Sequence, residues 1–144
     1  MAALIQNYFD GGLHCKRGCS DCCIEFSVLP LEAAIIQETH GLHSLQKGDK
    51  QNVCPFLENR LCRIYSHRPI ICRSQGMAIG YINDEKRAIE VSGCQLNFTD
   101  DYEFSPEQLL MLDEYNAQLA ELNNSYCEKN GLDPFHRIAL SEIA

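Results

Sequence analysis

Apolar residues in this chain occur in short runs separated by polar turns. The segment "EFSVLPLEAAIIQETHGL" predicts an extended piece as far as Leu29, followed by a helix that begins at Pro30 and ends near Gly41. The next stretch, "SLQKGDKQN", is polar and contains glycine, which is typical of a loop. The first third of the chain is therefore expected to contribute one short helix.

Two hairpins are expected after this loop. "CPFLENRLCRIY" predicts two short strands joined at residues 58–60, because apolar residues flank a polar turn and because Ile64 and Tyr65 favour strands. Residues 77–91 predict a second hairpin, in which "MAIGYI" and "AIEV" flank a turn at "NDEK". The middle of the chain is thus expected to form short paired strands.

The clearest helix signal begins at Ser105 and continues to about Lys129. "SPEQLL" supplies a serine N-cap, a proline at the first helical position and a glutamine for a capping box. Gly131 is a plausible stop. One apolar stripe recurs at spacings of three and four, at Leu112, Tyr115, Leu119, Leu122 and Tyr126. The stripe is typical of core packing, and pairing with a partner helix is the alternative.

Length and composition indicate one globular domain. A chain of 144 residues with 45% hydrophobic content can bury one core. We expect an α+β fold over residues 1–144, with short hairpins and helices organised around a cysteine-rich metal site. Residues 15–94 are expected to form the metal-binding region, and residues 105–129 the long C-terminal helix.

Charge is unevenly distributed along the chain. The net charge of −8 argues against general nucleic-acid binding, which relies on basic residues to neutralise phosphates. Residues 88–128 contain nine acidic residues and no Lys or Arg, so the long helix could present an acidic surface to a protein partner. Residues 54–73 instead contain Arg60, Arg63, Arg68 and Arg73 against Glu58 alone.

The amino terminus predicts a cytoplasmic protein with reduced cysteines. It has no basic n-region, and Asn7 and Asp10 interrupt its apolar run. No segment approaches the ~20 apolar residues that span a bilayer, so no membrane association is expected. Because a reducing compartment keeps thiols free, metal binding is a better explanation than disulfides for the nine cysteines.

Four cysteines fall within "HCKRGCSDCC", and four more follow in separate elements. Thiolates are soft donors, and four of them complete a tetrahedral Zn²⁺ site or hold one [4Fe–4S] cluster. We expect the metal ligands among Cys15, Cys19, Cys22, Cys23, Cys54, Cys62, Cys72 and Cys94. Cys127, on the long helix, is expected to be a buried small hydrophobe. Adjacent Cys22 and Cys23 cannot easily point the same way, so they serve different sites or one of them belongs to the core.

Two other motif interpretations fit less well. The spacing C-x3-C-x2-C also occurs in radical S-adenosylmethionine enzymes, but here only 14 residues precede it and too little chain follows for repeated βα units. A zinc ribbon needs two C-x2-C knuckles, and the interval between Cys54 and Cys62 is too wide for the second.

The two cysteine blocks resemble a known family. "CSDCC" followed by "CPFLENRLCRIYSHRPIICR" is similar to the YkgJ-type, bacterial-type cysteine-cluster proteins, described as zinc- or iron-chelating and related to flagellin lysine N-methylases. The resemblance covers about residues 15–94. It implies metal ligands at Cys19, Cys22, Cys23, Cys54, Cys62, Cys72 and Cys94. The chain departs from the family's C-x2-C-x2-C-C pattern at Cys15, which three residues separate from Cys19.

The resemblance implies metal chelation and no particular reaction. A methylase would need additional chain to bind S-adenosylmethionine, and the sequence contains no Gly-rich nucleotide loop. We therefore expect no catalytic residue, and an iron–sulfur- or zinc-binding protein with a structural, redox or metal-handling role. The alternatives are a structural zinc module for protein interaction and a remnant of a methylase-type enzyme. The four arginines, with Lys16 and Arg17, could offset the charge of the bound thiolates.

Overall fold

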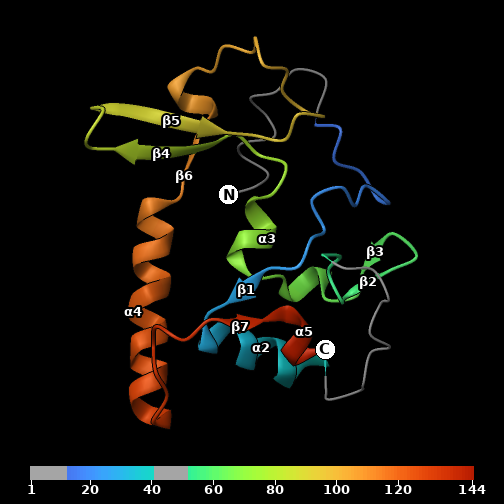
Figure 1. Ribbon diagram of the computed structural model, residues 1–144, viewed down its shortest axis with the longest axis vertical. Coiled ribbons are helices and arrows are strands. Elements are labelled where there is room, and N and C mark those ends of the chain that lie inside the picture. The colour runs from blue at the N-terminus through green and yellow to red at the C-terminus, as the bar shows by residue number, and fades with distance from the viewer. Residues whose placement is uncertain (1–12, 41–51) are drawn as a thin grey trace.

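The fold combines short helices and small sheets with one long helix. The computed structural model describes residues 13–40 and 52–144, and Figure 1 shows the arrangement of their elements. In chain order these elements are β1 (Ser27–Val28), α2 (Pro30–His40), β2 (Leu57–Glu58), β3 (Leu61–Cys62), the 3-10 turn η1 (Tyr65–His67), α3 (Ile70–Ser74), β4 (Ile79–Asn83), β5 (Ala88–Ser92), the 3-10 turn η2 (Pro106–Gln108), β6 (Leu110–Met111), α4 (Asp113–Asn130), β7 (Ile138–Ala139) and α5 (Leu140–Ile143). The expected α+β class is confirmed.

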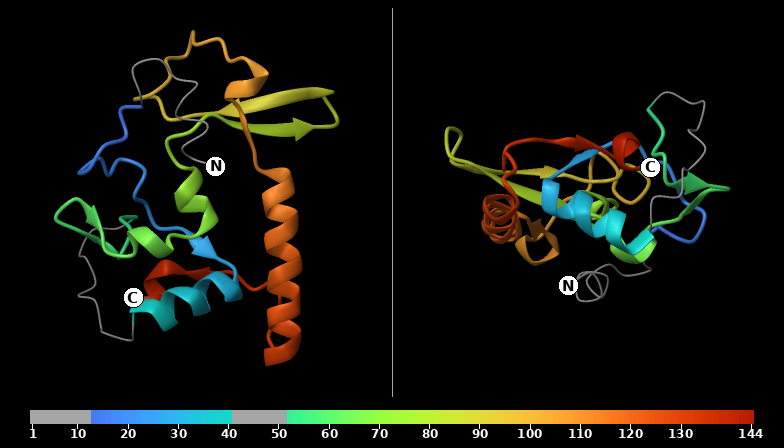
Figure 2. Two further views of the ribbon diagram at one scale, coloured as in Figure 1. Left: turned by 180° about the vertical axis from the view of Figure 1, so that it is seen from behind. Right: turned by 90° about the horizontal axis from the view of Figure 1, so that it is seen from below.

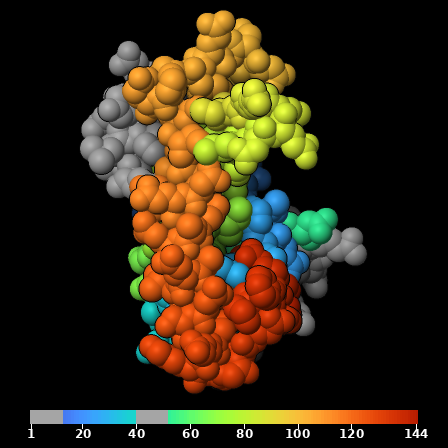
Figure 3. All heavy atoms as spheres, turned by 90° about the vertical axis from the view of Figure 1, so that its left-hand side faces the viewer, coloured from blue at the N-terminus to red at the C-terminus, as the bar shows by residue number. Residues whose placement is uncertain are grey.

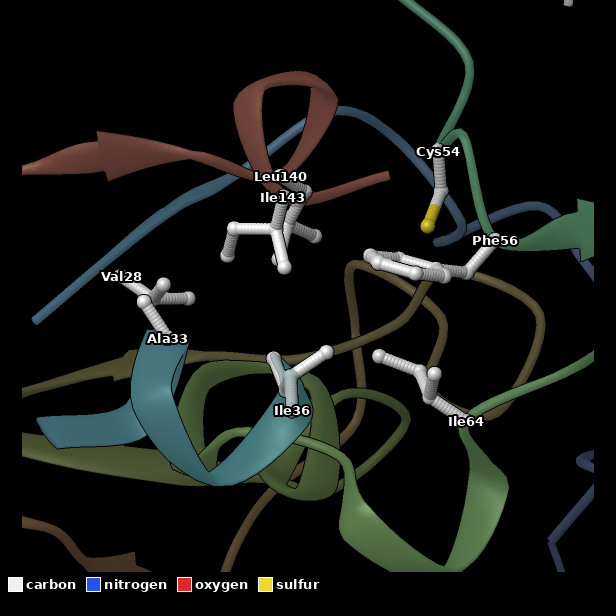
Figure 4. Packing of buried hydrophobic residues seen from close by; sticks show 8 residues of the cluster. All are labelled: Val28, Ala33, Ile36, Cys54, Phe56, Ile64, Leu140 and Ile143. Atoms are coloured by element: carbon white, nitrogen blue, oxygen red, sulfur yellow. The ribbon is translucent and has the colours of Figure 1, made fainter. Parts of the chain in front are cut away.

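The helix predicted at Pro30 is present as α2, and it forms the floor of the first hydrophobic cluster. Its buried face includes Ala33 and Ile36, which are one helical turn apart. The antiparallel pair β1–β7 brings α5 onto this face. Figure 4 shows the eight members of this first cluster, which are Val28, Ala33, Ile36, Cys54, Phe56, Ile64, Leu140 and Ile143. The predicted helix end at Gly41 and most of the predicted loop at residues 44–52 lie outside the described residues.

Both predicted hairpins are confirmed. In β2–β3, Leu57 pairs with Cys62, and the turn residues Asn59 and Arg60 both have positive φ, as a tight two-residue hairpin turn requires. The β4–β5 hairpin is longer and pairs five residues on each strand. Tyr65 does not extend a strand as predicted, because the chain turns into η1 directly after the buried Ile64.

The helix predicted to begin at Ser105 begins eight residues later. The capping box forms, with the Ser105 N–H donating to Gln108 Oε1 at 2.9 Å, but it closes only the single turn η2. The Leu110 N–H then donates to the Ala78 carbonyl at 2.8 Å, which places β6 parallel to β4 and buries Leu110. Pairing with the sheet therefore displaces the first turns of the expected helix. The predicted stop is correct, since Gly131 adopts the left-handed conformation at φ 65°.

The apolar stripe predicted for the long helix is correct in part. Leu112, Tyr115 and Leu119 are buried or half-buried, whereas Leu122 is 62% exposed. The position that is buried instead is Asn123, whose side chain accepts the Leu31 N–H at 3.1 Å and donates to the Pro134 carbonyl at 3.0 Å. Asn123 thus ties α4 to the start of α2, and Figure 3 shows the opposite face of α4 running along the surface.

A second hydrophobic cluster lies where the sheet β5-β4-β6 meets the start of α4. It consists of Met77, Ile79, Leu110 and Leu112, with Tyr115 packed against it. Figures 1 and 2 show α4 on one side of the molecule and the loop 13–26 with β2–β3 on the other, with α3 between them. None of the helices in the described ranges combines the length and apolar character that crossing a bilayer requires.

Candidate metal centre

One cavity gathers most of the cysteines, and we call it the cysteine cavity. It has a volume of about 540 Å³ and lies between the loop 13–26, the β2–β3 hairpin and α3. The cysteines that line it are Cys15, Cys19, Cys22, Cys23, Cys54, Cys62 and Cys72. Seven of the eight predicted ligands therefore lie on one cavity, although four segments of the chain supply them.

Two tight turns shape the first cysteine block. The Cys19 N–H donates to the Lys16 carbonyl and the Cys23 N–H to the Ser20 carbonyl, both at 2.9 Å. Gly18 supplies the positive φ of 91° that the first turn requires. These turns fold the block back on itself, so its cysteines face a common space.

Backbone pairing brings the second block to the first. The Cys54 N–H donates to the Cys23 carbonyl at 3.1 Å, beside an antiparallel bridge between Ile24 and Val53. The β2–β3 hairpin then returns the chain so that Cys62 lies opposite Leu57, whose own N–H donates to the Cys54 carbonyl. Cys23, Cys54 and Cys62 are thereby linked through main-chain contacts.

A buried carboxylate that the sequence analysis missed positions Cys72. Glu32 of α2 is 8% exposed, and its Oε1 accepts the N–H of Ile70, the first residue of α3, at 2.9 Å. Its Oε2 accepts the Leu29 N–H at 3.2 Å. Since α3 carries Cys72, the Glu32 carboxylate connects α2, on which the first cluster packs, to the helix that holds a predicted ligand. The capping pattern of Glu32 with Leu29, three residues apart, was the only sequence signal for it.

The cysteines of the cavity differ in their surroundings. Cys54 is 8% exposed within the first cluster, and Cys23 and Cys62 pack against that cluster. Figure 4 shows Cys54 beside Phe56 at one end of it. Cys15 is exposed, and Cys19 and Cys22 are half-buried outside the cluster. The cavity therefore has an apolar inner wall and an exposed outer rim.

Asn97, also missed from the sequence, holds the outer rim. Its Nδ2 donates to Cys15 Sγ at 3.3 Å and to the Gly76 carbonyl at 2.6 Å, and its Oδ1 accepts the His14 N–H at 2.7 Å. Gly76 has a φ of 88°, and any side chain there would collide with the Cys15 sulfur. Cys15, which departs from the family spacing, is thus fixed by specific contacts.

Cys94 is the one predicted ligand outside the cysteine cavity. It lines an adjoining cavity of about 410 Å³, which we call the side cavity, together with Cys22 and Gly76. Its carbonyl accepts the Asn97 N–H at 2.8 Å, so Cys94 begins the turn that carries Asn97 to Cys15. Cys22 lines both cavities.

Burial and mutual repulsion raise the pKa values of several thiols. Burial, followed by the neighbouring Cys23 and Cys15, raises the pKa of Cys22 to about 11. Burial, followed by Cys54 and Cys62, raises the pKa of Cys72 to about 12, although the Arg68 guanidinium acts in the opposite direction. The Cys22 and Cys72 thiols are therefore protonated at neutral pH without a metal, and a metal must displace these two protons to bind them.

Basic side chains surround the thiols. Lys16, Arg17, Arg60 and Arg68 line the cysteine cavity, and within the described part of the chain no Asp or Glu does so. Arg60 Nε donates to the Gly18 carbonyl at 2.9 Å, and the Arg68 guanidinium lies 3.8 Å from the centre of the Tyr65 ring.

Two of the predicted arginines lie away from the cavity. Arg63 pairs with Glu58 at the surface at 3.7 Å, and Arg73 donates to the carbonyls of Arg68 and Ser66. Of the four arginines expected to offset the thiolate charge, Arg60 and Arg68 therefore line the cavity, and Arg63 and Arg73 do not.

The donor set suits a soft metal, but its geometry is not pre-assembled. Seven thiols on one cavity match the ligands that Zn²⁺ and iron–sulfur clusters prefer. In residues 13–40 and 52–144, however, no three His, Cys, Asp or Glu side chains stand close enough to share a metal ion. Metal binding at this cavity therefore requires the two cysteine blocks to draw together.

Cys127 is separate from this constellation. It is 1% exposed on α4, and its sulfur lies 3.8 Å from Asn123 Oδ1. The prediction of a buried small hydrophobe is confirmed. Figure 1 shows α4 on the far side of α3 from the β2–β3 hairpin.

Comparison with known proteins agrees with the cysteine chemistry. A family model called CxxCxxCC, described as a putative zinc- or iron-chelating domain, matches residues 14–128. No curated protein and no solved structure matches the chain.

Proposed function

Because this chain belongs to the CxxCxxCC family of putative zinc- or iron-chelating domains, we propose that its cysteine cavity binds a thiolate-held metal centre. The observation that carries the proposal is the convergence of seven thiols from four chain segments on one cavity. A buried structural cysteine such as Cys127, which is 1% exposed and lines neither cavity, does not share a cavity with other thiols and four cations. We assign Cys94 to the centre as well, through its shared cavity with Cys22.

Of the two family metals, an iron–sulfur cluster is the one we propose first. A cluster held by four thiolates has a net negative charge, and cations close to its sulfurs stabilise that charge and raise its reduction potential. Lys16, Arg17, Arg60 and Arg68 line the cavity and could supply this effect. When bound, the centre would supply either electron transfer or cross-linking of the two cysteine blocks. The residues themselves provide the thiolate ligands and the surrounding positive charge.

Nine free cysteines also favour a reducing environment, so we propose a cytoplasmic location. The role we propose is structural or redox, with metal handling as the remaining option within the same site. No described residue is assigned a catalytic role.

Anaerobic purification without added metal tests the proposal. We expect iron or zinc at a near-stoichiometric ratio by elemental analysis, and a brown protein with thiolate-to-iron absorption if the centre is an iron–sulfur cluster. A colourless protein that contains zinc would favour the zinc alternative. Protein with neither metal, also after anaerobic reconstitution with iron and sulfide or with Zn²⁺, would refute the proposal.

A second candidate function is binding of a protein partner by α4. Leu122 is 62% exposed on this helix, and Glu114 and Glu121 are exposed with it. A partner with a basic surface and an apolar contact would suit this face. Measuring the binding of such a partner to wild-type protein and to Leu122→Ser would test the idea, and equal affinity for both would count against it.

A further inference from the structure

We propose that the cysteines form two adjacent metal centres, an inner one that includes Cys23 and an outer one that includes Cys22. This inference rests on the proposed function and specifies its site. The inner ligands are Cys23, Cys54, Cys62 and Cys72, and the outer ligands are Cys15, Cys19, Cys22 and Cys94. The division differs from the order in the sequence, where four cysteines lie before residue 24 and four of the proposed ligands after it.

The two adjacent cysteines lie in different surroundings. Cys23 packs against the first cluster, and its carbonyl accepts the Cys54 N–H at 3.1 Å. Cys22 is outside that cluster and lines the side cavity with Cys94. One residue therefore belongs to the apolar inner wall and the next to the outer rim.

The inner set comes from four separate segments of the chain that all line the cysteine cavity. Backbone pairing joins Cys23 to Cys54, and the β2–β3 hairpin brings Cys62 back opposite Leu57. Cys72 comes from α3, whose first N–H donates to the Glu32 carboxylate. Four thiolates are the number that a closed tetrahedral site requires, and binding of the metal would draw these four together from their positions around the cavity.

The outer set has its own structural support. Cys15, Cys19 and Cys22 occupy one loop that two tight turns fold back on itself. Asn97 contacts the Cys15 sulfur, and the same turn begins at Cys94. Cys94 lines the side cavity together with Cys22, whereas none of the four inner cysteines does so.

The charges of the cavity suit two centres. A Zn²⁺ ion and an oxidised [4Fe–4S] cluster each carry two positive charges, so eight thiolates on two such centres leave four negative charges. Four cations line the cysteine cavity, namely Lys16, Arg17, Arg60 and Arg68. A single centre would leave four thiols without a metal beside these cations.

The adjacent cysteines provide a matched pair of variants. We would measure metal per chain after anaerobic purification for wild type, Cys22→Ser and Cys23→Ser, with hydrogen exchange at α2 and α5 as a readout of the core. We expect Cys22→Ser to lose half of the wild-type metal and to keep core protection. Cys23→Ser should lose metal and also core protection, because its centre forms part of the first cluster. Cys127→Ser is the control and should retain all of the metal.

The outer variants keep the test decisive if Cys23→Ser does not fold. Cys15→Ser and Cys94→Ser should each reproduce the half-loss of Cys22→Ser with the core intact. Complete metal loss in these variants, or the same loss of core protection in Cys22→Ser as in Cys23→Ser, would overturn the two-centre proposal while leaving the metal-binding function in place. Wild-type protein without metal, even after reconstitution, would instead refute the function itself.

Discussion

The two hydrophobic clusters of this molecule are held together in different ways. The second cluster, around Ile79 and Leu110, lies on a sheet whose main hairpin pairs five residues on each strand. The first cluster, around Ile36 and Phe56, is enclosed by α2, α5 and strands of only two residues. Cysteines enter the first cluster and are absent from the second among the described residues.

This difference indicates where metal is needed for folding. Two-residue strands and tight turns form few hydrogen bonds. These bonds offset little of the conformational entropy that the backbone loses on folding. The segment from Cys54 to Ile64 therefore depends on contacts beyond its own secondary structure. A metal bound by cysteines of this segment would stabilise it, because the binding free energy of a thiolate site is in large part folding free energy.

Removing metal should produce the largest contrast between the clusters. With a chelator under reducing conditions, we expect amide protection to collapse in residues 52–75, while β4, β5 and α4 retain more of theirs. Thiolate sites in zinc peptides contribute on the order of 10 kcal/mol, comparable to the whole stability of a small domain. Hydrogen exchange with mass spectrometry would resolve the two regions.

Native protection throughout residues 15–94 in the metal-free protein would contradict this comparison. The cysteines would then sit on a fold that is stable without metal, and a labile carrier would describe the site better than a structural centre. Restoring the metal should recover the lost protection, which distinguishes metal loss from oxidation of the thiols.

Glu32→Gln should produce an intermediate effect confined to the first cluster. Glu32 accepts two backbone N–H groups, from Leu29 and from Ile70 at the start of α3. The glutamine amide keeps one acceptor oxygen, but its NH₂ group faces the second backbone N–H, which is left without an acceptor. We therefore expect the unfolding free energy to fall by about 1.5–3 kcal/mol. Because α3 carries Cys72, the metal should also dissociate more rapidly.

Glu38→Gln is the matched control, since Glu38 is an exposed carboxylate on the same helix. It should change stability by only a few tenths of a kcal/mol, as surface substitutions usually do. Denaturant titration and the rate of metal transfer to a chelator would measure both variants. Equal behaviour of the two would mean that Glu32 does not position α3.

Local signals in the sequence predicted the elements that local chemistry determines. Pro30 begins α2, Gly131 ends α4, and both hairpins occur where polar turns interrupt apolar runs. The signal at Ser105 was also real, because its capping box forms. It predicted the wrong element because the partner of Leu110 is Ala78, about 30 residues away, and no local pattern reveals that pairing.

The candidate site shows the same difference between what local sequence signals reveal and what the tertiary fold determines. Residue type and spacing identified the thiols, and seven of the eight predicted ligands line one cavity. The residues that position them, Glu32 and Asn97, are common polar residues whose role depends on contacts up to 83 positions away in the chain. The adjacency of Cys22 and Cys23 predicts that they serve different sites or that one of them belongs to the core, but the partners of each depend on the tertiary fold.

The smallest effect is expected from Cys127→Ala, which tests whether any cysteine outside the two cavities matters to the metal. Cys127 is 1% exposed on α4 and packs beside Asn123, so removing its sulfur leaves a small cavity and should cost about 1 kcal/mol. The Asn123 side chain keeps its hydrogen bonds to Leu31 and Pro134, and α4 should therefore remain docked on α2. Metal content should equal that of wild type, because Cys127 is absent from the residues that line the cysteine cavity and from those that line the side cavity. Thermal unfolding and elemental analysis of the same preparation would measure both quantities. Metal loss in Cys127→Ala as large as that in Cys22→Ser would show that the two sides of the molecule are not independent, and the contrast between them would have to be abandoned.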